Sequence, residues 1–344
     1  YGITISVDGY IYPSGYATST ITNRDFLVTK FDKNGEIVWS IKYDSNPVFD
    51  IGMCIAADEV GNFYLTGMSI NNTNFTWDIL TLKCNSSGNV LWKQRYDGGS
   101  SDGGFGIAID KNDGSVYVSG TSSKGVNGDD IILLKYTSSG NLVWVNNYHN
   151  SEKDHGYTVT VDQLGNVYVC GYRFNPANYT YDYVVLKYNS SGVLQWEKFY
   201  DTGDNDNAIG IAVDKLNNIY VTGQSFNGTN YDFLTIKYDK EGNLLWVKKF
   251  DSGKDDLGYA IALDKDNSVY LTGQTGQQSD QTTFDFLTLK YDTDGNLLWT
   301  KTYDGGMLDG GYAICVDDEN YVYVLGQTQK GTGYDYLLIK YAQY

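Results

Sequence analysis

A short motif recurs seven times along the chain at a nearly constant interval, and this repeat limits the folds that the chain can adopt. Each copy is an Asp, four mostly apolar residues and a Lys, and successive copies start 53, 52, 52, 50, 53 and 50 residues apart. Such a period is typical of propellers and solenoids, in which each repeat is one unit packed against its neighbours. The copies are Asp25–Lys30, Asp78–Lys83, Asp130–Lys135, Asp182–Lys187, Asp232–Lys237, Asp285–Lys290 and Asp335–Lys340.

Three further markers keep the same order in the repeats. A Trp follows the Lys by nine residues in six copies, from Trp39 to Trp299. An Asp closes a segment rich in Gly and Ala, and a Gly closes the segment after it, as in Asp264 and Gly273. We therefore interpret residues 1–344 as one domain of seven repeats. Their approximate bounds are 1–49, 50–101, 102–153, 154–205, 206–255, 256–308 and 309–344.

Each repeat contains four segments with the pattern of β-strands. In one copy they run from Gly258 to Asp264, Val269 to Thr275, Phe284 to Tyr291 and Leu297 to Tyr303. Short strands between Gly, Asn and Asp turns predict consecutive antiparallel hairpins, and no segment has sustained helical periodicity. Four-stranded units repeated radially are the blades of a propeller, so we expect an all-β, seven-bladed β-propeller.

Side-chain size predicts the order of the strands within a blade. The first segment carries Gly and Ala on one face, as at Gly258, Ala260 and Ala262. Blades converge towards the propeller axis, so we expect this strand innermost and the strand with the Trp outermost.

The sequence ends on the third strand of the seventh repeat, which includes Tyr334–Tyr341. We expect either that residues preceding Tyr1 supply the missing outer strand or that the last blade has three strands. The alternative is that the open edge accepts a strand from another molecule, because unpaired edges are templates for pairing.

The repeat resembles that of a known family. The segments GYAICVDDENYVYVLGQT and KYDTDGNLLWTKTYDGG are similar to the SBBP repeat, a β-propeller repeat of bacteria and archaea. The pairing of GIAVD with NIYVTG also resembles NHL-type repeats. The resemblance covers the whole chain and implies a secreted or surface-attached propeller, whereas it implies no particular activity.

Charge and hydropathy narrow the classes of partner. The net charge is −17, and nucleic acids require clustered Lys and Arg, so we expect no nucleic-acid partner. The sequence contains no run of 18 apolar residues, so we expect no membrane span.

The repeats also bear on catalysis, because a catalytic constellation must be asymmetric. The Asp and Lys markers occur in every repeat, which favours a structural role. The two histidines, His149 and His155, are expected in one surface loop, and no P-loop, GxSxG or HExxH motif is present. We therefore expect a protein that is not an enzyme. The alternative is a polysaccharide hydrolase or lyase with an axial pocket, which would need unrepeated carboxylates, His or Arg there.

The loop between the second and third strands varies most in length and sequence. Variation and binding both concentrate in such loops, so we expect any ligand face here. The alternative is that aromatics beside the Asp marker pack at the blade edge. The candidate binding residues are Phe75, Trp77, Phe174, Tyr179, Tyr181, Phe226 and Tyr231.

The loops between the fourth strand and the next first strand are rich in Asp and Gly. Carboxylates at this density can bind Ca²⁺, whereas Asp and Gly also simply form turns. We expect no other cofactor. The candidate calcium ligands are Asp201, Asp204, Asp206, Asp251, Asp255 and Asp256.

Six Asn-x-Ser/Thr sites fall in expected loops or turns and are candidates for glycosylation if the protein is exported. Taken together, the sequence predicts an extracellular or cell-surface module for binding, adhesion or assembly. Its expected partners are a surface protein, a carbohydrate, or further copies of the chain through the open edge. The sites are Asn71, Asn74, Asn85, Asn178, Asn189 and Asn227.

Overall fold

The fold is an all-β, seven-bladed β-propeller, as the sequence predicts. The computed structural model describes residues 1–20, 23–43, 49–125, 128–149, 153–276, 284–331 and 333–342. Within these ranges the blades have four antiparallel strands, the last blade has three, and no α-helix occurs. In the same part of the chain no helix is long and apolar enough to cross a membrane.

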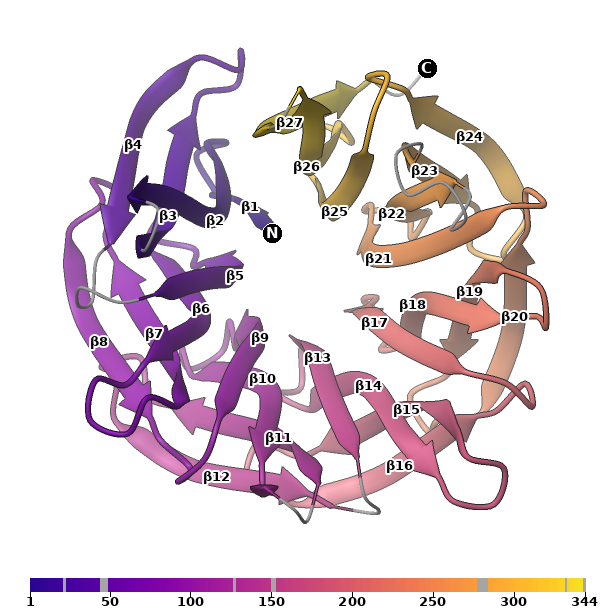
Figure 1. Ribbon diagram of the computed structural model, residues 1–344, viewed down its shortest axis with the longest axis horizontal. Helices are drawn as coiled ribbons and strands as arrows, with labels where there is room; N and C mark the ends of the chain where they lie inside the picture. Colours follow the sequence, from indigo (N-terminus) through magenta and orange to yellow (C-terminus); the bar gives the residue numbers. More distant parts are fainter. Residues whose placement is uncertain are drawn as a thin grey trace. The chain divides into compact units, whose positions relative to one another are not determined.

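The strands of each blade pair in chain order, which Figure 1 shows for each sheet. The first three blades contain β1 (Gly2–Ile5), β2 (Ile11–Thr20), β3 (Asn23–Phe31), β4 (Ile37–Tyr43), β5 (Asp50–Ala57), β6 (Phe63–Ile70), β7 (Trp77–Cys84), β8 (Val90–Tyr96), β9 (Asp102–Ile109), β10 (Val116–Ser123), β11 (Asp129–Tyr136) and β12 (Leu142–Tyr148).

The remaining blades repeat the same order. They contain β13 (Asp154–Val161), β14 (Val167–Asn175), β15 (Thr180–Tyr188), β16 (Leu194–Tyr200), β17 (Asp206–Val213), β18 (Ile219–Phe226), β19 (Tyr231–Tyr238), β20 (Leu244–Phe250), β21 (Asp255–Leu263), β22 (Val269–Gly276), β23 (Asp285–Tyr291), β24 (Leu297–Tyr303), β25 (Asp309–Val316), β26 (Val322–Lys330) and β27 (Gly333–Tyr341).

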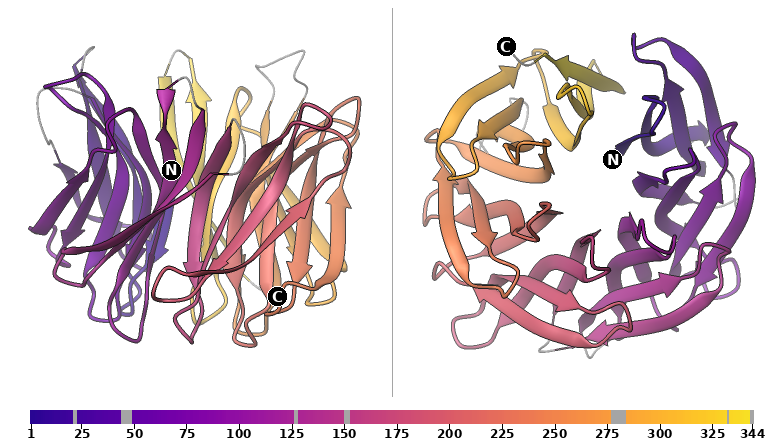
Figure 2. Two further views of the ribbon diagram at one scale, coloured as in Figure 1. Left: turned by 90° about the horizontal axis from the view of Figure 1, so that it is seen from below. Right: turned by 180° about the vertical axis from the view of Figure 1, so that it is seen from behind.

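The chain divides into two compact units, which are described separately. One comprises residues 1–174 and 187–195, and the other comprises residues 175–186 and 196–344. Within each unit, hairpin turns connect long strands at both ends (Figure 2).

First strands of adjacent blades pack against one another within each unit, as β9 does against β13 and β21 against β25. Small residues make this approach possible. A Cβ on Gly258 of β21 would lie 2.6 Å from the backbone oxygen of Gly223 and 2.7 Å from the Phe233 ring. The Gly and Ala face predicted from the sequence therefore lies at the packing of one blade on the next.

The repeated Lys and Trp connect neighbouring blades. Lys237 is 9% exposed, and its Nζ donates to the backbone oxygen of Thr293 in the next blade at 3.0 Å. The Trp246 Nε1 donates to the same oxygen at 3.1 Å, and the Lys237 ammonium lies 4.8 Å from the centre of the Tyr220 ring. Because the ammonium contacts both a hydrogen-bond acceptor and the face of an aromatic ring, these contacts offset the free-energy cost of burying its charge.

The same arrangement recurs in the other unit. The Lys83 Nζ and the Trp92 Nε1 both donate to the Ser138 oxygen, at 3.3 and 3.1 Å. Lys135 reaches the Ser190 oxygen at 3.0 Å. We refer to this Lys and Trp pair, together with the carbonyl that it contacts in the next blade, as the blade clamp.

The last blade has three strands, which was one of the two outcomes expected for the chain's end. In the described residues β27 pairs with β26, and no strand pairs with its other side. Tyr334 and Tyr336 of β27 are 52% and 47% exposed. Pairing of this edge with another molecule stays a prediction.

The blade clamp predicts a loss of stability in Lys237→Met, which keeps an apolar stem but removes the donor to Thr293. We expect a lower melting temperature, equivalent to about 1–2 kcal/mol of unfolding free energy. The control is Lys111→Met, since the Lys111 side chain is 79% exposed. An equal loss in both variants, measured by thermal denaturation, would contradict a role for the clamp.

Candidate functional site

A row of polar side chains crosses five of the blades near the loops between their second and third strands. In the blade of β17–β20, Asp206 of the first strand is opposite Ser225 of the second, and Ser225 is opposite Asp232 of the third. The rows Asp50–Ser69–Asp78, Asp102–Ser122–Asp130, Asp256–Thr275–Asp285 and Asp309–Thr328–Asp335 follow the same register.

Hydroxyl groups satisfy several of the buried carboxylates. The Thr202 Oγ1 donates to Asp206 at 2.9 Å and lies 3.2 Å from the Ser225 hydroxyl. One blade later, the Ser252 hydroxyl donates to Asp256 at 2.9 Å and lies 3.2 Å from that of Thr275.

Cationic side chains approach other members of these rows. Arg95 of β8 donates to the Asp78 carboxylate at 2.9 Å, and Lys249 of β20 donates to the Ser225 hydroxyl at 3.3 Å. The His149 Nδ1 lies 2.7 Å from an Asp130 oxygen. The basic side chain beside the carboxylates thus differs from blade to blade, although the carboxylates repeat.

Burial makes ionisation of several of these carboxyls costly. Desolvation is the largest cause that raises the pKa of Asp102, Asp206, Asp232, Asp256 and Asp285 above its ordinary value. For Asp285, the neighbouring Asp304 raises the pKa further. A positive charge beside such a group would therefore be stabilising.

Of the six candidate calcium ligands, Asp201, Asp204 and Asp251 lie in the loops before β17 and β21, and the other three begin those two strands. Asp206 and Asp256 are buried and accept the hydroxyl bonds described above. Asp201 and Asp251 each accept the N–H of the Gly two residues later at 2.6 Å, while Asp255 accepts the N–H of Tyr231 at 3.0 Å. Asp204 is half-buried in the first of these loops.

Other carboxylates come closer together than these six. In the described part of the chain, two groups of three have ligand oxygens within 4.8 Å of one another: Asp78 with Asp97 and Asp102, and Asp285 with Asp304 and Asp309. Sequence reasoning missed both groups, because each joins residues from two neighbouring repeats. Calcium at the six sequence-predicted residues stays a prediction.

The candidate binding aromatics fall into two sets. Phe75 and Tyr179 are 77% and 81% exposed, whereas the other five are half-buried. The rings of Phe226 and Tyr231, for example, pack together with centres 5.1 Å apart. The half-buried set therefore fits the alternative in which these aromatics pack at the blade edge. The rings of Phe75 and Tyr179 are exposed to solvent. The half-buried residues are Trp77, Phe174, Tyr181, Phe226 and Tyr231.

Phe75 and Tyr179 have the same unusual backbone conformation in equivalent loops. Their φ angles are +59° and +61°, in the left-handed region that side chains with a Cβ rarely adopt. Each N–H donates to the backbone oxygen four residues earlier, that of Asn71 at 2.8 Å and that of Asn175 at 2.9 Å. The loops therefore hold an exposed ring at a strained position, which costs on the order of 1 kcal/mol or more.

The six candidate glycosylation sites all lie in turns or loops. The Asn74 and Asn178 side-chain oxygens accept the hydroxyl of the Thr two residues later, at 2.8 and 2.7 Å. The Asn71, Asn85, Asn189 and Asn227 oxygens accept backbone N–H groups two residues later. Glycosylation of any of them stays a prediction.

The expectation of a surface loop is wrong for His155. The residue lies on β13, because this strand already begins at Asp154, and it is half-buried. Its ring packs against Phe105, Tyr157 and Tyr172, with centres 4.9, 4.4 and 5.3 Å away. Its Nδ1 has no hydrogen-bond partner among the described residues. Desolvation lowers the pKa of His155 to about 4, although Asp129 opposes the shift.

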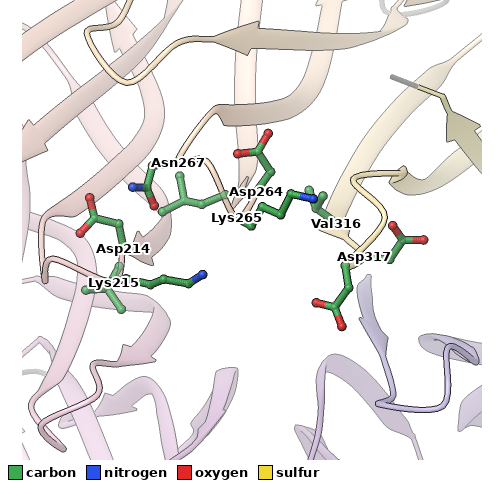
Figure 3. Close-up of a pocket in the computed structure, with 10 residues that line it drawn as sticks. Asp214, Lys215, Asp264, Lys265, Asn267, Val316 and Asp317 are labelled. Carbon is green, nitrogen blue, oxygen red and sulfur yellow. The ribbon is translucent and has the colours of Figure 1, made fainter. Parts of the chain in front are cut away.

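A pocket opens between the turns that follow β17, β21 and β25 (Figure 3). Lys215 and Lys265 extend into it. Asp214 and Asp264 each accept N–H groups of their own turn and the hydroxyl of a Tyr on the strand that follows. The lining also includes Asp317 and Asp318, so it carries more carboxylates than ammonium groups. Sequence reasoning missed it because its residues belong to the ordinary repeated turns.

His155 predicts a pH dependence of stability. Its folded pKa of about 4 lies below the 6.5 of an unfolded His, so the unfolded chain binds the proton more readily. The stability contributed by the neutral ring is complete above the unfolded pKa and is lost as pH falls towards 4. We expect His155→Phe to lose less stability than the natural chain between pH 7 and 4, by at most about 3 kcal/mol. His149→Gln is the control, and identical pH profiles for all three proteins in thermal denaturation would contradict this account.

Three comparisons place the fold among known proteins. Residues 201–232 match the model of the SBBP family, described as a beta-propeller repeat. No curated protein is detectably similar to the chain. The polysaccharide lyase Uly1 shares the fold at 11% identity, with a TM-score of 0.62 over 98% of this chain and 88% of that one.

Two further solved structures are similar at low identity. Chaetomium thermophilum Sqt1, bound to the N-terminus of ribosomal protein L10, has 11% identity and a TM-score of 0.55, covering 94% of this chain and 81% of that one. XC5397, a gluconolactonase of Xanthomonas campestris, has 14% identity and a TM-score of 0.44, covering 77% and 86%. At these identities the first two likenesses show the fold alone, and the last carries no argument. Residues 201–232 thus match the SBBP β-propeller repeat, and the described strands form a seven-bladed β-propeller.

Proposed function

We propose that the chain is a non-enzymatic binding module, outside the cell or at its surface, whose β6–β7 loop and β14–β15 loop each bind a ligand through an exposed aromatic ring. The observation that carries this proposal is the display of Phe75 and Tyr179. Both rings are exposed, and both occupy left-handed backbone, where Gly would be free of strain. Strain held at an exposed site is typical of ligand-binding positions.

The surroundings of these rings favour a carbohydrate ligand. Phe75 follows Asn71–Asn74 and Tyr179 follows Asn178, so each exposed ring stands among polar side chains. A flat ring in a polar setting can stack on the C–H face of a sugar while amides and hydroxyls bond its oxygens. A stable protein interface usually buries about 800 Å² per partner around an apolar centre, whereas each of these rings is surrounded by polar residues in the sequence.

The rest of the fold supports binding over catalysis. Lys237 with Trp246, and Lys83 with Trp92, are held in the blade clamp. The repeated Asp that closes a first strand holds its own turn, as Asp214 does by accepting the N–H of Leu216. The location outside the cell rests on the family resemblance and on the Asn-x-Ser/Thr sites.

This function predicts that Phe75→Ala and Tyr179→Ala weaken binding of neutral polysaccharides by at least about tenfold, the value of roughly 1.4 kcal/mol. The melting temperature should stay the same or rise, because the two rings are exposed and their removal takes away little buried apolar surface. Binding can be measured on a glycan array and then by calorimetry. The matched control is Val60→Ala, which is 81% exposed in a turn at the other end of its blade.

Two results would contradict the proposal. One is unchanged glycan binding in both variants. The other is capture of a protein ligand, and no glycan, that is lost in the same variants, which would keep the site but change the class of ligand.

A second candidate function, polysaccharide elimination, is favoured by the unrepeated group around His155. The neutral imidazole stacks on Tyr172, whose neighbour Arg173 is opposite Asp154 in the strand register. A neutral His can accept a proton, and a guanidinium can bind the carboxylate of a uronic acid. Uly1, which has a similar fold, is a polysaccharide lyase.

The elimination candidate is tested by incubating the chain with acidic polysaccharides and following the ultraviolet absorbance of unsaturated products. The non-enzymatic proposal expects no product. Product formation that His155→Gln abolishes and His149→Gln preserves would overturn that proposal and establish the lyase.

A further inference from the structure

Three carboxylates meet where β23 and the turn after β24 approach the start of β25. Asp285, Asp304 and Asp309 each place one oxygen within 4.8 Å of the others. Asp309 is buried, Asp285 is half-buried and Asp304 is exposed, so the group reaches from the protein interior to solvent. Three like charges at this distance repel one another, and burial removes the water that would screen them.

Two buried oxygens at this place lack a hydrogen-bond partner among the described residues: the Asp309 Oδ1 and the Thr328 Oγ1. Their residues are 1% and 3% exposed. A Cβ on Gly305 would lie 2.8 Å from the Asp309 oxygen and 2.6 Å from the Thr328 oxygen. Both oxygens therefore face the space beside Gly305, and Thr328 is not part of the carboxylate group.

The preceding loops show what occupies the same space elsewhere. The residue equivalent to Gly305 is Thr202 in one loop and Ser252 in the next. Their hydroxyls contact both the first-strand carboxylate and the second-strand hydroxyl, as described above. Gly305 has no hydroxyl, which leaves the equivalent pair of oxygens unsatisfied.

The site also lacks the side-chain cation found in equivalent rows. Arg95 is opposite Leu80 in its blade and Lys249 is opposite Leu234, whereas Thr302 takes this position opposite Leu287. The Asp78 group, which has the same three carboxylates, contains Arg95 at 2.9 Å.

Other positive charges are not bonded to the group in the described residues. Lys254 is near enough to lower the pKa of Asp285, and no ion pair joins it to these three carboxylates in the described ranges. Lys330 instead lies 3.8 Å from an Asp335 oxygen, where both side chains are more than 60% exposed.

We propose that Ca²⁺ binds to Asp285, Asp304, Asp309 and the Thr328 hydroxyl, with water completing its coordination. Ca²⁺ takes six to eight oxygen ligands at about 2.3–2.6 Å, so oxygens of one ion can lie up to about 5 Å apart. The Gly305 N–H donates to the Asp309 Oδ2 at 2.5 Å and the Gly306 N–H to the Asp304 Oδ1 at 2.7 Å. These bonds orient both carboxylates and leave their second oxygens for the ion.

The ion would connect the blade of β21–β24 to that of β25–β27 at the place where other blades use a hydroxyl and a side-chain cation. It differs from the calcium predicted from the sequence, which used Asp201, Asp206, Asp251 and their neighbours. The two assignments are separable by substitution.

The experiment is calorimetric titration of the chelator-treated chain with Ca²⁺ alone, combined with melting temperatures with and without Ca²⁺. Gly305→Ser supplies the hydroxyl that Ser252 supplies one loop earlier, and Asp304→Asn removes an exposed charge with little risk to folding. We expect the natural chain to bind one Ca²⁺ at this site and to melt at a higher temperature with it. Each variant should bind at least tenfold more weakly, and Gly305→Ser should be at least as stable as the natural chain without the ion.

Asp251→Asn is the matched control, because Asp251 is the equivalent of Asp304 in the loop where Ser252 is present. It should bind Ca²⁺ as the natural chain does. The proposal is overturned if the natural chain binds no Ca²⁺, or if Gly305→Ser and Asp304→Asn bind it unchanged. Loss of binding in Asp251→Asn alone would instead assign calcium to the loops predicted from the sequence.

Discussion

The backbone carbonyl in the turn between the third and fourth strands connects one blade to the blade before it, and the arrangement of the blades depends on this contact. At Thr293 and at Ser138 it accepts hydrogen bonds from both the Lys and the Trp of the preceding blade. The carbonyl lies in a tight turn, so its own strand cannot pair with it. The Lys can be buried because this acceptor and a Tyr ring receive its charge.

This contact explains why residues that look chemically active serve the fold. A Lys held between a carbonyl and an aromatic ring is unavailable as a catalytic base, and its repetition keeps the blades alike. We therefore propose that function depends on positions where the repeats differ. Gly305 replaces a hydroxyl, Thr302 replaces a cation, and Phe75 and Tyr179 take a backbone conformation that suits Gly. In each case the blade gives up a local stabilising interaction, which is expected where a ligand supplies the missing one.

The sequence predicted the fold closely because the pattern of each strand is local. The expected strands Val269–Thr275 and Leu297–Tyr303 correspond to β22, Val269–Gly276, and β24, Leu297–Tyr303. The start of the first strand was harder to predict: β13 begins at Asp154, which places His155 in an aromatic group on a strand. The charged residues Lys153 and Asp154 make this segment resemble a loop in the sequence. The structure shows instead that Asp154 is opposite Arg173 and His155 is opposite Tyr172 in the strand register.

The candidate sites were only partly predictable, since exposure depends on how loops fold. The seven candidate aromatics lie in or beside the same kind of loop, yet two are exposed and five are half-buried. The carboxylate group at Asp285 combines residues from two repeats, so Asp304 and Asp309 follow Asp285 by 19 and 24 residues in the sequence. No local motif marks it. The signal that could have found it is the Gly that follows Asp304, where two earlier repeats have Thr or Ser.

The central claim is that repeated residues maintain the fold and unrepeated ones carry function. The most direct measurement is a saturation mutational scan of the whole chain that records folded abundance and polysaccharide binding separately. The account predicts that substitutions at Lys237, Trp246 and their equivalents lower abundance and binding together, whereas those at Phe75 and Tyr179 lower binding alone. Substitutions at the repeated Lys or Trp that abolish binding while abundance is unchanged would contradict it.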